Sequence, residues 1–121
     1  MNSTASLPQH HHVDLGRFEQ LNVDLSMFPA VARVFVNILP AWRDEMQRAM
    51  VWSDVHALRE SLHKMKGCCG MMGAERLALE IAQVEQSLVL HGLDRSTPQL
   101  LDVLRKVGEM EDEVKILGAV T

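Results

Sequence analysis

The sequence has few aromatic residues and no excess of positive charge. Only 4% of its 121 residues are aromatic and none is tyrosine, whereas eight are methionine, which favours an aliphatic helical core over a sheet of aromatic and β-branched pairs. The formal net charge of −4 argues against a general nucleic-acid binder, which needs surplus lysine and arginine to displace phosphate counterions. We therefore expect an all-α protein of a single domain that does not bind nucleic acid.

Long hydrophobic runs and separated cysteines are also missing. The longest uncharged apolar stretch, residues 34–39, is far shorter than the roughly 20 residues that cross a bilayer, and the polar N-terminus lacks the order of a signal peptide. The two cysteines, Cys68 and Cys69, are adjacent, so they cannot form the long-loop bridges of secreted domains. We expect a cytoplasmic protein without direct membrane contact, whose cysteines are reduced and packed.

The N-terminal segment differs from the rest of the chain. Residues 1–12 are polar, contain a proline and show no apolar period, so we expect them to be disordered. The three histidines at positions 10–12 could bind a metal, although histidines in a flexible tail more often have no such role. Leucine and phenylalanine at helical spacing in residues 14–21 predict a short helix that covers one end of the fold. Residues 13–121 are expected to form the folded domain.

Two longer amphipathic helices are predicted next. The first begins at an N-cap, Ser26, and carries Pro29 in its first turn, where a missing amide is harmless. Pro40 lies inside it and predicts a kink near residues 36–39 or a break into two helices. The second begins at an N-cap, Ser53. The core stripe expected for the first is Val31, Val34, Phe35, Ile38, Trp42, Met46 and Met50, and for the second Val55, Leu58, Leu62, Met65, Cys69 and Met72.

Two further helices complete the prediction. Gly73 ends the preceding helix, and residues 74–91 form the next one, with Gly92 as its C-terminal stop. A short turn over residues 93–97 leads to Pro98 at the start of the last helix. Four long helices with short connections predict an antiparallel up-and-down four-helix bundle, preceded by the short N-terminal helix.

One stretch, HKMKGCCGMMG (residues 63–73), places a histidine among lysines and glycines inside a predicted helix. On a helical wheel with 100° per residue, the apolar stripe from Leu58 to Cys69 defines the core direction, and His63 points about 120° away from it. The residues on the same outer side are His56, Arg59, Lys66, Gly67 and Gly70, with Lys64 further round the helix. His63 is therefore predicted to be exposed and ringed by positive charge.

The glycines of this stretch need a physical reason. Each glycine inside a helix costs about 0.5–1 kcal/mol relative to alanine. We expect the small size of Gly67 and Gly70 to let another protein approach His63, with His56, Arg59 and Lys64 completing the docking surface. Lys66 suits an anionic transferred group, and a neutral imidazole nitrogen is a competent nucleophile toward an acyl phosphate. Alternatively, the glycines lie where another helix crosses closely or where φ is positive.

The same stretch resembles the motif of histidine-containing phosphotransfer (HPt) domains, which reads roughly H-x-[LIM]-K-G-x-x-x-x-x-G-A before a leucine-rich helix. The resemblance is specific over residues 62–85 and looser from residue 14 to about residue 117. It implies a four-helix bundle with the phosphorylated histidine on the second long helix. It also implies that the partner is a receiver domain, of a response regulator or a hybrid histidine kinase, with a phosphorylatable aspartate.

The resemblance implies in-line transfer of a phosphoryl group from a receiver aspartate to His63 and onward to another receiver. Lys66 would screen the phosphoryl charge, and Mg²⁺ would be held by the receiver, so no intrinsic cofactor and no ATP site are expected. If the turn between the two central helices is centred near Met72, antiparallel pairing places His63 across from about residue 81, or from slightly later positions if the loop is asymmetric. Glu85 is then within reach of the inner ring nitrogen. Glu85 could then fix the tautomer of His63.

Several alternatives remain open from the sequence. The chain could be the phosphoacceptor part of a sensor kinase, although Lys-Met-Lys-Gly follows His63 instead of the acidic residue and Arg-Thr-Pro of that family. It could be a helical adaptor that binds receivers without being phosphorylated, which the presence of both His63 and Lys66 argues against. Cys68 and Cys69 could join His63 in a metal site, although adjacent cysteines point in different directions. The module could stand alone or form the C-terminal domain of a hybrid kinase tethered to the inner membrane.

Overall fold

The computed structural model describes residues 11–22 and 24–120. The elements are α1 (Leu15–Asn22), the 3-10 helix η2 (Leu25–Met27), α2 (Phe28–Val51), α3 (Val55–Met71) and α4 (Glu75–Val120). Gly92, with φ 81° and ψ 178°, divides α4 into two bundle helices. We call residues 75–91 the N-terminal arm and residues 93–120 the C-terminal arm of α4.

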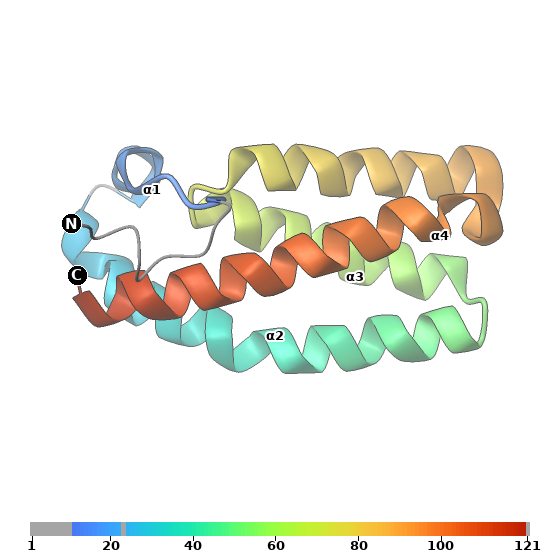
Figure 1. Cartoon of the computed structure of the whole chain (residues 1–121), viewed down its shortest axis with the longest axis horizontal. Coiled ribbons are helices and arrows are strands. Elements are labelled where there is room, and N and C mark those ends of the chain that lie inside the picture. The colour runs from blue at the N-terminus through green and yellow to red at the C-terminus, as the bar shows by residue number, and fades with distance from the viewer. Residues whose placement is uncertain (1–10, 23, 121) are drawn as a thin grey trace.

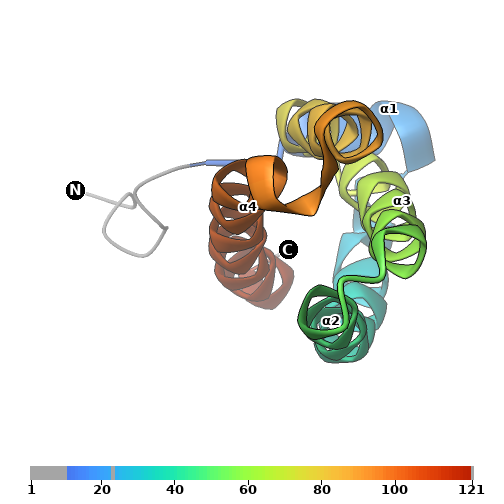
Figure 2. The same ribbon diagram turned by 90° about the vertical axis from the view of Figure 1, so that its right-hand side faces the viewer.

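The four long helices form the predicted antiparallel up-and-down bundle (Figure 1). Viewed from one end, they follow one another in the order N-terminal arm, α3, α2 and C-terminal arm (Figure 2). α1 lies across the end of the bundle where α3 turns into α4 (Figure 1), and the amide of Asp14 donates to the carbonyl of Gly73 there, at 3.2 Å. The prediction of a short N-terminal helix covering one end is confirmed.

Gly73 and Gly92 end their helices as predicted, both with positive φ, 83° and 81°. A Cβ atom on Gly73 would lie 2.3 Å from the carbonyl oxygen of Asp14, so this position excludes any side chain. The turn predicted over residues 93–97 is wrong, because these residues are helical. A single left-handed glycine suffices to change the direction of the chain, so no longer connection is needed.

The start of α2 differs from the prediction. The carboxylate of Asp24 accepts from the amide of Ser26 at 2.9 Å and caps η2, whereas the N-cap of α2 itself is Met27, without a side-chain hydrogen bond. Pro29 lies in the first turn as predicted. The helix is continuous across Pro40, so the predicted alternative of a break is wrong.

The start of α3 is shifted by one residue. Asp54 is the N-cap, and its carboxylate accepts from the amide of Ala57 at 3.0 Å. Ser53, predicted to be the cap, has a positive φ of 52° and belongs to the turn. Aspartate and serine are both good caps, and the sharp turn after α2 decides between them by placing Ser53 before the helical geometry begins.

The core confirms the stripe of α3 but only part of the stripe of α2. Leu58, Leu62, Met65, Cys69 and Met72 are fully buried, as are Phe35 and Met46 of α2. Val34 and Ile38, predicted to be in the core, are exposed, and the buried residues of α2 are instead Phe28, Ala32, Phe35, Leu39, Met46 and Ala49. The helix is rotated relative to the predicted stripe because apolar residues occupy two adjacent faces of α2.

This double apolar face also raises the hydropathy of the helix. Among the described residues, one stretch, Leu25–Val51, is long and apolar enough to cross a membrane by length and composition alone. The core helix of a soluble protein meets the same criterion, and Phe35, Leu39 and Met46 of this helix are fully buried in the bundle. The composition of α2 thus reflects its core face together with a second apolar face.

The N-terminal residues that the structure describes are held against the C-terminal arm. The carboxylate of Glu113 accepts from the amides of His12 and Val13 at 2.8 and 3.1 Å, and it contacts Nδ1 of His11 at 3.1 Å. His12 Nε2 lies 3.0 Å from the carboxylate of Glu109. Residues 1–10 of the segment predicted to be disordered lie outside the described residues, whereas positions 11 and 12 are ordered by these contacts, so the prediction is wrong there.

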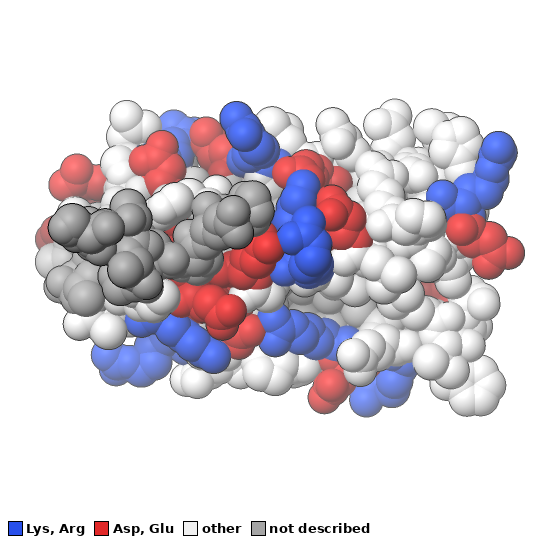
Figure 3. Space-filling view, in the orientation of Figure 1, with Lys and Arg blue, Asp and Glu red and all other residues white. Residues whose placement is uncertain are grey.

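The outer face of the C-terminal arm carries mixed charge. Acidic and basic side chains lie side by side on it, and uncharged side chains dominate the right-hand part of the view (Figure 3). Arg105, for example, pairs with Asp102 at 2.8 Å and Glu109 at 2.7 Å, and these contacts raise the pKa of its guanidinium. The positive charges on this face are therefore locally compensated.

Candidate functional site

His63 lies midway along α3 on the face away from the core, as the helical wheel predicts. Its side chain is 70% exposed, while the preceding Leu62 and the following Met65 are fully buried. The apolar stripe thus fixes the orientation of α3, and the imidazole is presented to solvent from a rigid helix. Such an exposed ring on a well-packed element can react with a group that another protein carries.

Two charged side chains lie next to the imidazole. Glu85, from the N-terminal arm of α4, places Oε2 at 3.6 Å from Nδ1 of His63 and Oε1 at 3.4 Å from Nζ of Lys66. Only 16% of the Glu85 side chain is exposed. The structure therefore brings together the three residues that the sequence indicated for phosphoryl chemistry, and it leaves Nε2 of His63 on the side of the ring away from Glu85.

The surface around His63 combines these groups with other charges of α3. A depression of about 320 Å³ is lined by His56, Arg59, Glu60, His63, Lys64 and Glu85. His56 faces Glu60 of the next helical turn at 3.4 Å. The predicted docking residues His56, Arg59 and Lys64 are all exposed and reach this depression.

The two glycines after the histidine have open space above them. A Cβ atom added at Gly67 or Gly70 would meet no atom of the described residues within 4 Å, apart from the neighbouring backbone of α3. Both have helical backbone without positive φ. The alternative of a closely crossing helix or a strained turn is therefore wrong for both positions, and their small size leaves open space beside His63.

The sequence did not reveal an apolar groove beside the histidine. This groove, about 520 Å³ in volume, lies between α2 and α3; its lining residues are Val31, Val34, Phe35, Ile38, Trp42, His63, Lys64, Gly67, Cys68, Met71 and Met72. Val34 and Met71 are 65% and 56% exposed. A signal was present in the sequence, because apolar residues at both 34 and 35 and both 38 and 39 make a wider stripe than one helix interface covers.

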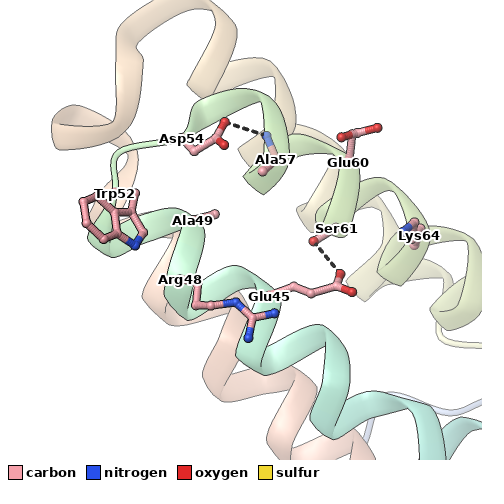
Figure 4. A pocket seen from close by; sticks show the side chains of 9 residues that line it. All are labelled: Glu45, Arg48, Ala49, Trp52, Asp54, Ala57, Glu60, Ser61 and Lys64. Carbon is pink, nitrogen blue, oxygen red and sulfur yellow. Dashed lines mark hydrogen bonds between the residues drawn. The ribbon is translucent and has the colours of Figure 1, made fainter.

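A second hollow continues along α2 and α3 toward their connecting turn, and it is polar. Its volume is about 470 Å³, and Figure 4 shows Glu45 of α2 reaching across to Ser61 of α3. The hydroxyl of Ser61 donates to the Glu45 carboxylate at 3.2 Å. Lys64 lines both hollows, so the face beside His63 changes from apolar to charged along the helices.

The cysteines are packed, as expected. Cys69 is fully buried and Cys68 is partly buried. Burial raises the pKa of the Cys68 thiol to about 11 and raises that of Cys69 even further. Neutral thiols at physiological pH are poor nucleophiles, so neither cysteine is a candidate nucleophile on this face.

The comparison with known proteins supports this description. The family model of the Hpt domain matches residues 30–118, whereas no curated protein and no solved structure matches the chain. Modules of this family carry phosphoryl groups in two-component signalling without being kinases, and in general they interact with receiver domains of response regulators. The match includes α3, most of α2 and nearly all of α4. The chain therefore belongs to the Hpt domain family.

Proposed function

We propose that this domain relays a phosphoryl group between receiver-domain aspartates through a phosphohistidine at His63. One observation carries the proposal: an exposed imidazole has Nδ1 turned toward a largely buried carboxylate, that of Glu85, at 3.6 Å. A carboxylate on that side favours the tautomer with the proton on Nδ1. The lone pair of Nε2 is then available on the outer side of the ring.

The chemistry follows from this arrangement. The Nε2 lone pair attacks the phosphorus of a receiver aspartyl phosphate, the bond between phosphorus and the aspartate oxygen breaks, and the aspartate leaves as a carboxylate. Lys66 screens the charge of the phosphoryl group. Mg²⁺ is held by the receiver in this scheme, and the domain contributes no cofactor of its own. The reverse reaction passes the group to the next receiver.

Docking of the receiver relies on the two kinds of surface beside His63. The apolar groove offers Val34, Ile38 and Met71, which are exposed in the isolated domain, and their burial by a partner is favourable. Gly67 and Gly70 add no bulk that would hold the partner away. Exposed Arg59 and Lys64 attract the acidic site of a phosphorylated receiver.

The cellular setting belongs to the proposal as well. A phosphorelay module of this kind functions in the cytoplasm, either alone or as the C-terminal domain of a hybrid sensor kinase held at the inner membrane. The alternative function is that of a helical adaptor which binds receivers without accepting phosphate. The exposed groove would serve both functions, whereas the grouping of His63, Lys66 and Glu85 favours the relay.

The deciding experiment incubates the domain with a receiver carrying a radiolabelled aspartyl phosphate. We expect an acid-labile label on the domain and none on His63→Gln, whereas His91→Gln, a change at an exposed histidine at the end of the N-terminal arm, should still accept the label. His63→Gln should unfold with nearly the wild-type free energy, within about 0.5 kcal/mol, because the side chain is outside the core. Labelling of His63→Gln would remove the relay proposal, and labelling by ATP alone would favour a kinase.

A further inference from the structure

Glu85 has an unusual contact pattern for a carboxylate with so little exposure. Its two nitrogen contacts, Nδ1 of His63 at 3.6 Å and Nζ of Lys66 at 3.4 Å, both lie beyond ordinary hydrogen-bond distance. Among the described residues, Oε1 of Glu85 is buried without a hydrogen-bond partner. Buried polar atoms are normally satisfied, so this carboxylate keeps acceptor capacity that the resting site does not use.

Phosphorylation would change the charges around this carboxylate. An imidazole that bonds phosphorus through Nε2 and keeps its proton on Nδ1 is a cation, whereas the unphosphorylated tautomer is neutral. The phosphoryl group adds negative charge on the outer side, where Lys66 is 32% exposed and has, among the described residues, the long contact to Glu85 as its one ion pair. Opposite charges attract most strongly at the shortest distance, so Lys66 gains the phosphoryl group as an anionic partner, and the newly cationic ring gains Glu85.

We propose that Glu85 is a switched counter-ion: Lys66 neutralises it in the resting site and leaves it for the phosphoryl group, and Glu85 then holds the proton on Nδ1 of the phosphohistidine. This inference rests on the proposed phosphorylation of His63. No proton is transferred in the step. The bond between Nε2 and phosphorus forms, the bond from phosphorus to the aspartate oxygen breaks, and only the partner of Lys66 changes.

A proton kept on Nδ1 makes the onward transfer of the phosphoryl group easier. When the bond between Nε2 and phosphorus breaks, a ring that carries a proton on Nδ1 leaves as neutral imidazole, whereas a ring without that proton must leave as an imidazolate anion. A nearby carboxylate favours the protonated ring. Glu85 thereby keeps the phosphohistidine ready for transfer at a pH where a solvated phosphohistidine would lose the proton.

The other charges near the ring do not replace this role. From α3, the charged or titratable residues that line the depression with His63 are His56, Arg59, Glu60 and Lys64. α2 contributes only uncharged side chains to the groove that His63 lines. Glu60 lies on the same helix and faces His56 at 3.4 Å, so Glu85 is the carboxylate that faces Nδ1.

The test measures how the lifetime of phosphohistidine depends on pH. The domain is phosphorylated with phosphoramidate, a small-molecule phosphoryl donor that needs no receiver, and loss of the label is followed from pH 5 to pH 9. In Glu85→Gln, the midpoint of the rate profile should move to lower pH by about one unit, a tenfold change in the protonation equilibrium. Glu80→Gln, which removes another carboxylate of the N-terminal arm, one that pairs with Lys106 of the C-terminal arm, should leave the midpoint unchanged.

A second variant moves the profile in the opposite direction. Lys66→Met keeps the length of the side chain but leaves the charge of Glu85 uncompensated, so the midpoint should rise. Lys115→Met, which removes a lysine that contacts Glu111 on the C-terminal arm, serves as its control. This variant also covers the case in which Glu85→Gln does not fold. Coincident profiles for wild type and either test variant would overturn the counter-ion role and leave the relay intact. A His63 that accepts no phosphoryl group from phosphoramidate or from a receiver would overturn both.

Discussion

The two arms of α4 each carry a carboxylate with little exposure, and the two are satisfied very differently. Glu113, on the C-terminal arm, is fully buried and accepts from the amides of His12 and Val13 at 2.8 and 3.1 Å. Glu85, on the N-terminal arm, has no partner nearer than 3.4 Å among the contacts of the described residues. The oxygens of Glu113, which joins two distant parts of the fold, accept hydrogen bonds. The carboxylate of Glu85, which lies beside His63, has an oxygen without a hydrogen-bond partner among the described residues.

Two glycines of the hairpin formed by α3 and α4 also differ in whether packing against the rest of the fold requires them. Gly73, at the turn, has positive φ, and its Cβ position is filled by the backbone of Asp14. Gly67, six residues earlier and one turn from His63, has open space in the same direction. Packing therefore requires glycine at the bundle end. It does not require glycine beside His63, where we propose that the small residue lets a partner approach. Each difference can be tested by substitution.

The largest effect is expected for Gly73→Ala. The methyl group would have to occupy the space of the Asp14 carbonyl oxygen, 2.3 Å away, on a residue with φ of 83°. Overpacking and left-handed strain together predict a loss of about 3 kcal/mol in the free energy of unfolding. Urea denaturation measures this loss. Gly67→Ala is the matched control and should gain about 0.5–1 kcal/mol; equal effects at the two glycines would contradict the division between them.

The second-largest effect is expected for Glu113→Ala. The amides of His12 and Val13 would lose their acceptor in a partly buried position, which predicts a loss of about 2 kcal/mol. Thermal and urea unfolding measure the change, and Asp112→Ala, at an exposed neighbouring position, is the control. Phosphotransfer by the folded variant should be normal. A variant that kept its stability but lost phosphotransfer would link this end of the bundle to the reaction.

Gly67→Gln should separate function from stability. The longer side chain meets open space, so the fold should keep or gain stability of up to about 1 kcal/mol because glutamine has the better helix propensity. Transfer from a phosphorylated receiver should slow about tenfold, because the side chain stands between the two proteins. Paired melting and transfer measurements decide the matter, and a variant that melts earlier yet transfers normally would rule out a docking role for this position.

The smallest effect is expected for Val34→Ser in the apolar groove. Val34 is 65% exposed, so the free energy of unfolding should change by less than about 0.5 kcal/mol. Receiver affinity should fall about threefold, since the exchange removes apolar surface that a partner would cover. Titration calorimetry gives the affinity, with Val89→Ser, an exposed valine on the N-terminal arm, as the control. An equal loss in both variants would move the docking surface away from the groove.

The sequence analysis placed residues correctly in a helix with one apolar face and incorrectly in a helix with two. α3 has a single apolar stripe, so the wheel correctly placed Leu58, Leu62 and Met65 in the core and His63 outside. The antiparallel register then brought Glu85 to the histidine. α2 has two apolar faces, so the same method wrongly buried Val34 and Ile38 and missed the groove that they line.

Other features leave no local pattern for such reasoning to detect. The contacts of His12 and Val13 with Glu113 join residues about a hundred positions apart, and a hydrogen bond of that range produces no periodicity. Both predicted helix starts were one residue early. α2 follows Met27, with Asp24 capping the preceding 3-10 helix η2, and α3 follows Asp54, which is adjacent to the predicted cap Ser53. Choosing between two good caps needs the path of the preceding turn, which tertiary packing decides.

The contacts of Glu113 also bear on the order in which the chain folds. Hairpins of neighbouring helices can form early, since their contacts close short loops, whereas joining residue 12 to residue 113 closes almost the entire chain. During synthesis, the first ordered residues therefore have to wait until the last helix has left the ribosome. Until then Glu113 is hydrated, and the final locking of the domain includes removal of water from its carboxylate.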